Sequence, residues 1–177
     1  GKASAAMAKA LENKWPWPLE GLVITRYGHK IENERINIVE ASHPVPDYIG
    51  LKASQRILEY TKNLTSRDLV IVLISGGGSS LLTLPPDGIS LEDKKIINIA
   101  LLKSGAPISS INCVRKHISA IKGGRLARSV APARLETLII SDVPGNDIAT
   151  IASGPTVPDP TTFEEAISII KKYNIHM

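Results

Sequence analysis

Short apolar runs that alternate with helical repeats divide most of the chain into strands and helices. Residues 69–74 form a continuous apolar run rich in β-branched side chains, and residues 135–141 repeat this pattern. Such runs are typical of strands that are buried on both faces. Residues 21–25 and 36–40 are shorter β-rich runs followed by turn residues, and we predict strands there as well.

Helical spacing of apolar residues fills the segments between these strands. Residues 2–11 are rich in alanine and predict a first helix. Asp47 is placed to cap a second helix, in which apolar residues recur at spacings of four, three and four. This apolar face consists of Ala53, Ile57, Tyr60 and Leu64.

Capping residues mark further helices in the second half of the chain. Ser90 can cap a helix that runs to residue 102, and another helix is predicted for residues 109–122. Thr162 and Glu165 form a capping box. The helix that they open carries Phe163, Ala166, Ile167 and Ile170 on one side.

Strands that alternate with helices indicate a Rossmann-like α/β domain, in which a mostly parallel sheet is covered by helices on both faces. The length of 177 residues fits one domain, and no internal repeat or low-complexity linker divides it. We therefore expect residues 1–177 to form a single layered α/β domain. In such domains, ligands bind beyond the carboxyl ends of the strands.

The amino-acid composition argues against some classes of function but does not identify one. The net charge is +4, but the Lys and Arg residues are spread along the chain, and aromatic residues make up only 4%. A nucleic-acid-binding module normally has a basic stripe with stacking residues, and a small anionic ligand explains the charge equally well. The single cysteine, Cys113, excludes an internal disulfide and a cysteine-based zinc cluster.

The hydropathy of the chain and the nature of its first residues predict the cellular location of the protein. No stretch reaches the ~18 apolar residues that a membrane helix needs, and no signal peptide opens the chain. We therefore expect a cytoplasmic protein that binds neither membranes nor nucleic acid. The chain begins at Gly1 without an initiator methionine and runs straight into a helical stretch, so we expect that preceding residues are missing.

A glycine-rich segment follows the apolar run at residues 69–74 and is the sharpest chemical feature. It consists of Ser75, Gly76, Gly77, Gly78 and Ser79. Three consecutive glycines allow positive φ and bring backbone N–H groups close to an anion, while the serines add hydroxyl donors. The segment matches neither G-x-x-x-x-G-K-[ST] nor G-x-G-x-x-G, so it is not a P-loop or a dinucleotide fingerprint. A flexible turn is the alternative.

Two charged residues accompany this loop in the expected fold. Lys2 lies at the opening of the first helix, where an amine is unfavourable unless an anion stands nearby; a solvated surface lysine is the alternative. Asp142 directly follows the second apolar run, where its carboxylate would point into the cleft and help to hold Mg²⁺. Asn146 and Asp147 follow it, and helix capping accounts for those two equally well. Residues 42–44 (SHP) could form a substrate edge, although a connector made rigid by proline is the simpler account.

A basic helix face is the remaining candidate. In the helix predicted for residues 109–122, polar donors recur at spacings of three, four and three. These donors are Asn112, Arg115, Ser119 and Lys122. Such a face suits a phosphate or carboxylate, which Arg115 could bind with two parallel hydrogen bonds. A solvated basic face is the alternative, and His117 lies off this line and is taken as structural.

Seven segments, in order, resemble signatures of the class II glycerate kinases, also called glycerate 2-kinases or the MOFRL family. Some members of that family carry an older label of hydroxypyruvate reductase. The segments are residues 1–4 (GKAS), 42–47 (SHPVPD), 75–79 (SGGGS), 112–117 (NCVRKH), 122–124 (KGG), 141–145 (SDVPG) and 151–159 (IASGPTVPD). The resemblance covers essentially the whole chain.

The resemblance implies a two-domain enzyme that transfers the γ-phosphoryl group of ATP to D-glycerate with Mg²⁺, in most members giving 2-phosphoglycerate. Members run to more than twice this length, so the chain resembles most of their N-terminal domain and lacks a counterpart of the C-terminal domain. The family's lysine falls on Lys2, whereas a functional arginine of the C-terminal domain has no counterpart. This chain alone is therefore expected to be inactive, and a homodimer is left open.

On that basis, Lys2 is expected to stabilise charge on the transferring phosphoryl group. The loop at residues 75–79 would hold the substrate carboxylate or phosphate through its N–H groups, and Asp142 would lie near Mg²⁺. Arg115 and Lys122 would support the loop, and Asn112 is a further candidate for binding the substrate or phosphate. Two other functions stay open: an oxidoreductase acting on hydroxypyruvate, for which the chain lacks a dinucleotide fingerprint, and a non-catalytic domain that binds sugar phosphates.

Overall fold

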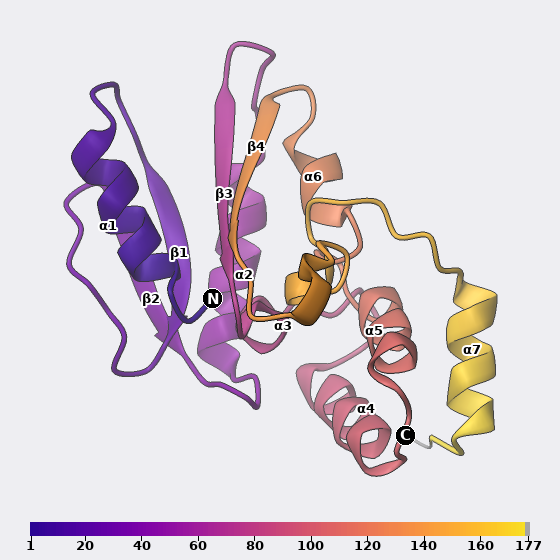
Figure 1. Ribbon diagram of the computed structural model, residues 1–177. Coiled ribbons are helices and arrows are strands. Elements are labelled where there is room, and N and C mark those ends of the chain that lie inside the picture. Colours follow the sequence, from indigo (N-terminus) through magenta and orange to yellow (C-terminus); the bar gives the residue numbers. More distant parts are fainter. Residues whose placement is uncertain (176–177) are drawn as a thin grey trace.

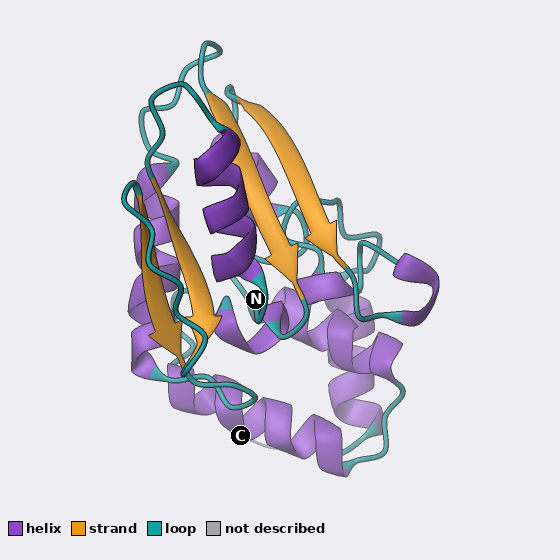
Figure 2. Ribbon diagram, turned by 60° about the vertical axis from the view of Figure 1, so that its left-hand side comes forward, coloured by secondary structure: helices purple, strands orange, loops and turns teal. Residues whose placement is uncertain are grey.

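The computed structural model describes residues 1–175, in which two pairs of parallel strands are surrounded by helices (Figure 1). Strand β1 (Gly21–Arg26) pairs with β2 (Ile36–Ala41), and β3 (Leu69–Ser75) pairs with β4 (Arg134–Ile140). All of these strands point in the same direction (Figure 2). The predicted α/β class with parallel strands is therefore confirmed, although no backbone ladder joins β1 to β3 in this part of the chain.

Helices connect and cover the strands. Within residues 1–175 they are α1 (Ser4–Lys14), α2 (Tyr48–Tyr60), α3 (Gly78–Leu81), α4 (Leu91–Lys103), α5 (Ile108–His117), α6 (Arg125–Val130) and α7 (Phe163–Lys172), with the 3-10 turns η1 (Pro144–Asn146) and η2 (Ile151–Ser153). The longest of them, α2 and α4, have 13 residues each. None of the described helices combines the length and the apolar character needed to cross a membrane.

Three of the predicted helix starts are confirmed by their capping hydrogen bonds. Asp47 Oδ1 accepts a hydrogen bond of 2.8 Å from the N–H of Gly50 in the first turn of α2. Capping boxes precede α4 and α7, and they consist of Ser90 with Asp93 and of Thr162 with Glu165. In each case side-chain oxygens satisfy N–H groups that the first helical turn leaves without a partner.

Helices cover the β1–β2 pair on both faces, as the sequence predicts. α1 packs on one face, where Ala5 and Ala8 share a buried cluster with Val23. α2 packs on the other face, where Ala53 and Ile24 are buried together. Val23 and Ile24 are neighbours in β1, so their side chains point to opposite faces of the strand. The small alanines of α1 and α2 allow both helices to approach the strands closely.

The other long helices form a layer of their own beside the β3–β4 pair (Figure 1). α4, α5 and α7 share one buried cluster, which includes Ile97, Leu101, Val114 and Ala166. α6 contacts β4 directly. Because α4, α5 and α7 bury their apolar side chains against one another, they leave one face of the β3–β4 pair uncovered.

The prediction that β3 and β4 are buried on both faces is wrong for this chain. Leu69 at the start of β3 is 43% exposed, and Leu138 and Ile140 in β4 are 52% and 53% exposed. β4 alternates between exposed and half-buried positions, which is the pattern of a strand with one covered face. A continuous apolar run indicates that a strand can be covered on two faces, but the covering elements depend on tertiary structure.

The helix predicted for residues 109–122 is shorter than expected. α5 ends at His117, Ile118 leaves helical geometry with φ −98° and ψ 37°, and Gly123 and Gly124 have positive φ before α6 begins. The polar face expected on this helix is therefore not formed: α5 carries Asn112 and Arg115, and the turn after it carries Ser119 and Lys122. The glycine pair breaks the helical repeat and opens α6, which the sequence analysis did not predict.

Smaller differences concern helix boundaries and apolar faces. α1 begins at Ser4, two residues later than predicted, and α2 ends at Tyr60, so Leu64 lies beyond it. Tyr60 is 42% exposed, and Phe163 and Ile167 of α7 are 58% and 49% exposed. Helical spacing groups these side chains on one face, but the neighbouring elements cover only part of that face.

Candidate functional site

The carboxyl ends of the strands lie at one side of the molecule, and the N-terminus lies between the ends of the two strand pairs (Figure 2). Parallel α/β folds bind ligands at this side because the loops that follow the strands converge there. We call the group that gathers there the strand-end site. It consists of Lys2, His43, the glycine loop (residues 75–79) and Asp142.

The glycine loop is held in place by the residues that lead into α1. Lys2 N donates to Gly76 O at 2.8 Å, and Ala3 N donates to Ser75 Oγ at 3.0 Å. Ser75 is 1% exposed, and its hydroxyl also lies 3.2 Å from Ser4 Oγ. The loop is therefore an anchored turn, which favours the binding interpretation over a flexible connector.

At two of the loop positions, neighbouring side chains leave no room for a residue larger than glycine. Gly77 has φ 84°, and a Cβ at this position would lie 2.9 Å from His43 Cδ2 and 3.1 Å from Lys2 Cγ. A Cβ on Gly76 would collide with the carboxylate of Asp142. The backbone turn thus contacts all three polar side chains of the site.

Three consecutive N–H groups in the loop donate to no acceptor among residues 1–175; they belong to Gly77, Gly78 and Ser79. Successive free N–H groups in such a turn form a concavity that binds anions. Buried N–H groups normally find a partner, and a carboxylate or phosphate oxygen would supply one here. The arrangement is suited to an anionic ligand.

The charged side chains of the site form an ion pair that is open to solvent. Lys2 Nζ lies 3.3 Å from Asp142 Oδ2, and the two side chains are 40% and 54% exposed. Ion pairs with such exposure contribute little to stability because water screens them. Both groups can therefore exchange this partner for a ligand at small cost.

His43 belongs to the site, although the sequence analysis treated residues 42–44 as a connector. Its ring lies against Gly77. Burial lowers the pKa of His43, and the positive charges of Lys2 and Arg26 lower it further. The imidazole is therefore neutral at pH 7 and keeps one nitrogen as an acceptor. The signal that could have found it is its position, two residues after the end of β2.

The three predicted residues Asn112, Arg115 and Lys122 lie elsewhere in the protein, and two of them have side-chain hydrogen bonds there. Arg115 Nε donates to Asn98 Oδ1 at 3.0 Å and so ties α5 to α4. Lys122 Nζ donates to Leu82 O, directly after α3. Asn112 is 6% exposed within α5. Lys122 thus supports the helix that begins inside the glycine loop, while Arg115 and Asn112 lie in the helical layer.

Lys94, which the sequence analysis did not single out, is buried in the same region as Lys122. The two residues are 2% and 1% exposed, and Lys94 Nζ donates to Ile118 O at 2.7 Å. Burial lowers the pKa of Lys94 to about 8, with a further contribution from Arg115. Burial also lowers the pKa of Lys122 well below its ordinary value, and both neighbouring cations lower it further. A lysine inside a helical pattern carries no sequence signal of such burial.

The strand-end site provides one carboxylate as a possible metal ligand. Within residues 1–175, no group of three or more His, Cys, Asp or Glu side chains could hold an ion. Mg²⁺ is commonly held by one or two carboxylates together with water and substrate phosphates. Asp142 fits that donor set, whereas Asp147 accepts hydrogen bonds from Ala149 N and Thr150 Oγ1 and so stabilises a local turn.

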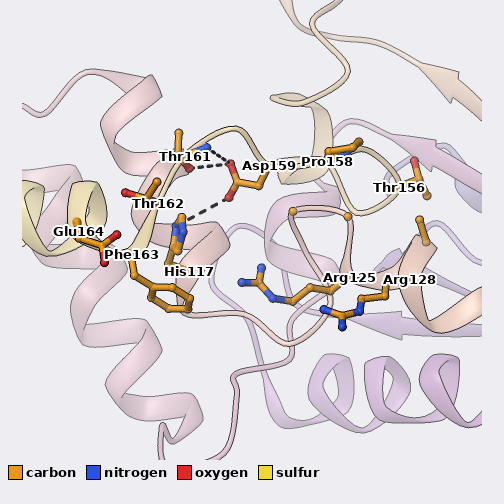
Figure 3. A pocket seen from close by; sticks show the side chains of 13 residues that line it. His117, Arg125, Arg128, Thr156, Pro158, Asp159, Thr161, Thr162, Phe163 and Glu164 are labelled. Carbon is orange, nitrogen blue, oxygen red and sulfur yellow. Dashed lines mark hydrogen bonds and ion pairs between the residues drawn. The ribbon is translucent and has the colours of Figure 1, made fainter.

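A separate cavity of about 580 Å³ lies between α6 and the segment that leads into α7 (Figure 3). The carboxylate of Asp159 is enclosed there: Oδ1 accepts from Thr161 Oγ1 at 2.7 Å and from Lys116 Nζ at 3.3 Å. His117 Nδ1 lies 3.8 Å from the other oxygen. Arg125 Nη1 donates to Lys116 O at 2.9 Å. Asp159 Oδ1, Lys116 and Arg125 are bonded within the protein and fix the segment before α7, whereas Asp159 Oδ2 is buried without a hydrogen-bond partner among the described residues.

Comparison with known proteins places the chain in a family. Residues 1–177 match the family described as a domain of unknown function, DUF4147. A D-glycerate 2-kinase from Thermotoga maritima is 47% identical over 177 residues, which are 99% of this chain and 42% of that protein. A protein from Agrobacterium vitis, named provisionally as a hydroxypyruvate reductase, is 58% identical over 178 residues, or 100% of this chain and 41% of that protein.

A solved structure agrees with these sequence matches. The crystal structure of a glycerate kinase from Thermotoga maritima superposes with a TM-score of 0.96 at 46% identity, and the match covers 100% of this chain and 43% of that one. The chain thus spans about two fifths of the length of its relatives. It belongs to the DUF4147 family and, with it, to the glycerate 2-kinase family, to whose N-terminal part it corresponds.

Proposed function

We propose that the longer protein containing this chain transfers the γ-phosphoryl group of ATP to D-glycerate, giving 2-phosphoglycerate, and that this chain forms most of its N-terminal domain. Relatives named as glycerate 2-kinases match 99% of the chain at 48% and 47% identity. The structural observation that carries the proposal is the contact between Lys2 and a turn with three free N–H groups. A positive charge and free amides at the strand ends suit an anionic substrate.

Lys2 stabilises the charge of the transferring phosphoryl group in this proposal. Phosphoryl transfer requires positioning and charge neutralisation more than covalent chemistry by the protein. The Lys2 side chain is 40% exposed and its ammonium is held by a weak ion pair, so it is free to turn toward phosphate oxygens. Its backbone bond to Gly76 keeps the side chain next to the loop that binds the anion.

The glycine loop holds the carboxylate of D-glycerate or a phosphate through the N–H groups of Gly77, Gly78 and Ser79. Lys122 supports the loop from the interior through its bond to Leu82 at the end of α3. Arg115 joins α5 to α4 through Asn98, and Asn112 is buried in α5, so these two residues have no contact with the loop in this proposal. Preorganised donors of this kind are most effective because they need no rearrangement when the charge develops.

Asp142 and His43 complete the site. Asp142 is the carboxylate that would hold Mg²⁺, and the ion would supply positive charge to the nucleotide phosphates. His43 is neutral and can accept the proton of the glycerate hydroxyl as that oxygen bonds to the γ-phosphorus and ADP leaves. Both residues contact the glycine loop, so one turn positions both.

Product analysis of the full-length protein tests this proposal. With ATP, Mg²⁺ and D-glycerate, phosphorus NMR should show 2-phosphoglycerate formed in an amount equal to the ADP released. Formation of 3-phosphoglycerate would keep the kinase and overturn the proposed hydroxyl. No ATP-dependent loss of D-glycerate by folded protein would overturn the proposed activity.

The name of the Agrobacterium relative motivates a second candidate, the reduction of hydroxypyruvate. A nicotinamide-dependent reductase would consume NADH in the presence of hydroxypyruvate and without ATP. The kinase proposal predicts no change in nicotinamide absorbance under those conditions. Tight binding of a phosphosugar without turnover in either assay would instead favour a non-catalytic sugar-phosphate-binding domain.

A further inference from the structure

Two strand edges face each other across a groove of about 750 Å³. The groove separates β1 from β3, which carry no ladder to each other among residues 1–175. Both strands line it along most of their length, through residues 21–24 and 69–75. Since β1 and β3 run in the same direction, the groove has two parallel edges (Figure 2).

The hydrogen bonds show which backbone groups face this groove. In a parallel strand, the N–H and C=O of one residue point to one edge, and those of the next residue point to the other. The backbone oxygen of Asp68, the residue before β3, accepts a hydrogen bond of 3.0 Å from Arg134 N at the start of β4. Asp68 therefore faces β4, and the backbone groups of Leu69, Ile71 and Leu73 point away from β4. Leu73 O accepts from Ser4 Oγ at 3.3 Å, which agrees with that assignment.

The same reasoning applies to β1. Ile24 O accepts from the amino group of Gly1 at 2.8 Å, so Ile24 and Leu22 direct their backbone groups into the groove. Rows of N–H and C=O groups on two facing strand edges are a template for another strand. Backbone groups that are shielded from water normally have hydrogen-bond partners.

Helices close the groove on its two faces. Leu11 of α1 and Trp15, which directly follows α1, line it, and so do Ile57 and Tyr60 of α2. The groove is therefore about as deep as one layer of strands, and apolar side chains line both of its faces. A strand fits such a groove because it pairs at both edges and presents side chains to both faces. A helix satisfies its own backbone and is about 10 Å wide, so it would leave both edges unpaired.

The amino group of Gly1 lies at the end of this groove. It donates to Ile24 O as a strand residue would, and the next N–H, that of Lys2, donates to Gly76 O after β3. The chain thus already bridges β1 and β3 at its first two residues. Burial lowers the pKa of the Gly1 amino group to about 5, which shows how poorly a charge fits there. A peptide N–H at the same position carries no charge.

We propose that the groove receives an additional parallel strand, formed by the residues that precede Gly1 in the longer protein, so that the sheet becomes continuous in the order β2, β1, new strand, β3, β4. The relatives are more than twice the length of this chain, which leaves ample sequence to supply it. A strand that ends at Gly1 would place Lys2 directly after the central strand of the sheet. The inference is independent of whether the protein phosphorylates glycerate.

Hydrogen exchange at individual amides of the full-length protein, followed by NMR, tests this proposal. The N–H groups of Leu22, Ile24, Ile71 and Leu73 should be protected as strongly as those of Val23 and Val72, which face β2 and β4. The amides of the six residues before Gly1 should be protected as well. Rapid exchange of the groove-facing amides beside protected Val23 and Val72 would overturn the proposal.

A second measurement identifies the segment that fills the groove. Deletion of the residues before Gly1 from the otherwise complete protein should make the groove-facing amides exchange rapidly, while Val72 stays protected. If those amides stayed protected, a different part of the protein would occupy the groove and the proposed occupant would be wrong. Should the deletion variant not fold, nuclear Overhauser contacts in the unaltered protein between the residues before Gly1 and both Leu22 and Leu73 still decide the question, because only a segment in the groove lies beside both strands.

Discussion

Lys2 Nζ and Asp142 Oδ2 lie 3.3 Å apart, although 140 positions separate the two residues in the sequence. The contact forms because the chain before α1 is bonded to the end of β3, and Asp142 follows β4, which pairs with β3. Gly76 lies directly beside the carboxylate and has no room for a Cβ. A cation and a carboxylate thus share one glycine turn, which is the arrangement that the proposed function requires.

Replacement of Lys2 tests its role in catalysis. In the full-length enzyme, Lys2→Ala should lower kcat for glycerate phosphorylation by about 10²–10³, the usual loss on removing one preorganised group. Because the Lys2–Asp142 pair is solvent-exposed, the melting temperature should hardly change. Lys9→Ala, which removes a lysine of α1 that is paired with Glu12 and not with the glycine loop, is the matched control and should keep kcat. A near-normal kcat for Lys2→Ala would remove Lys2 from the mechanism.

Gly77 and Gly88 provide a matched pair for testing the loop. They have nearly the same φ, 84° and 85°, so alanine at either position costs about 1–2 kcal/mol of backbone strain. A Cβ at Gly77 also meets His43 and Lys2, whereas a Cβ at Gly88 meets nothing within 4 Å. Gly77→Ala should therefore lower kcat/KM by about tenfold or more through misplacement of the site, and Gly88→Ala should not. Equal kcat/KM in both variants would mean that the loop is only a turn.

Much of the fold could be predicted from the sequence because its causes are local. Asp47 and Ser90 mark helix starts through side chains that bond backbone groups three residues away. The strands at residues 21–26 and 36–41 end within one residue of their predicted positions, since turn residues follow them directly. Signals of this kind act within one helical turn or one strand and need no knowledge of tertiary contacts.

The errors concern features that depend on distant parts of the chain. Leu138 and Leu69 belong to apolar runs, but their exposure depends on which elements cover the strands. α5 ends at His117, a few residues before a glycine pair. The apolar repeat nevertheless continues through Ile118 and Ile121 in the turn that follows the helix. Both apolar residues are buried there without being helical, so the repeat alone could not locate the helix end.

The candidate site was predictable only in part for the same reason. Parallel strands bring their carboxyl ends together, so Lys2, the glycine loop and Asp142 could be expected to meet. His43 was not identified because a histidine between a strand and a proline has a structural explanation that suffices. Lys94 was not identified because burial of a helical lysine results from the packing of α4 against α5.

His43 should give the reaction an acidic limb in its pH profile. Burial and the charges of Lys2 and Arg26 lower the pKa of His43 below 6.5, so the acceptor nitrogen is lost only as pH falls below that value. In the full-length enzyme, kcat/KM should decline there, and His43→Gln should have lower activity without that decline. His29→Gln is the control, because His29 lies in the loop after β1 and should keep the wild-type profile. An unchanged acidic limb in His43→Gln would assign the titration to another group.

The buried lysines should make the protein more stable at alkaline pH. The pKa of Lys94 is about 8 in the folded state and about 10.5 when the chain is unfolded. Between these values the unfolded state binds more protons, so the free energy of unfolding rises with pH; below pH 8 both states are protonated and the penalty is constant. Lys122 acts in the same direction, since its pKa is lowered by burial as well.

Urea unfolding of the full-length protein at several pH values between 8 and 10 isolates the contribution of Lys94. The unfolding free energy of the wild type minus that of Lys94→Met should rise by about 1.4 kcal/mol per pH unit, the value for one proton. Subtraction removes the contributions of groups that do not interact with Lys94, and it retains only the part of the Lys122 shift that the charge of Lys94 causes. Lys95→Met, next in α4 and paired with Glu92 at the surface, should leave the slope unchanged. Parallel curves for the wild type and Lys94→Met would show that Lys94 keeps an ordinary pKa, and hence that it reaches solvent or a counter-ion in the complete protein.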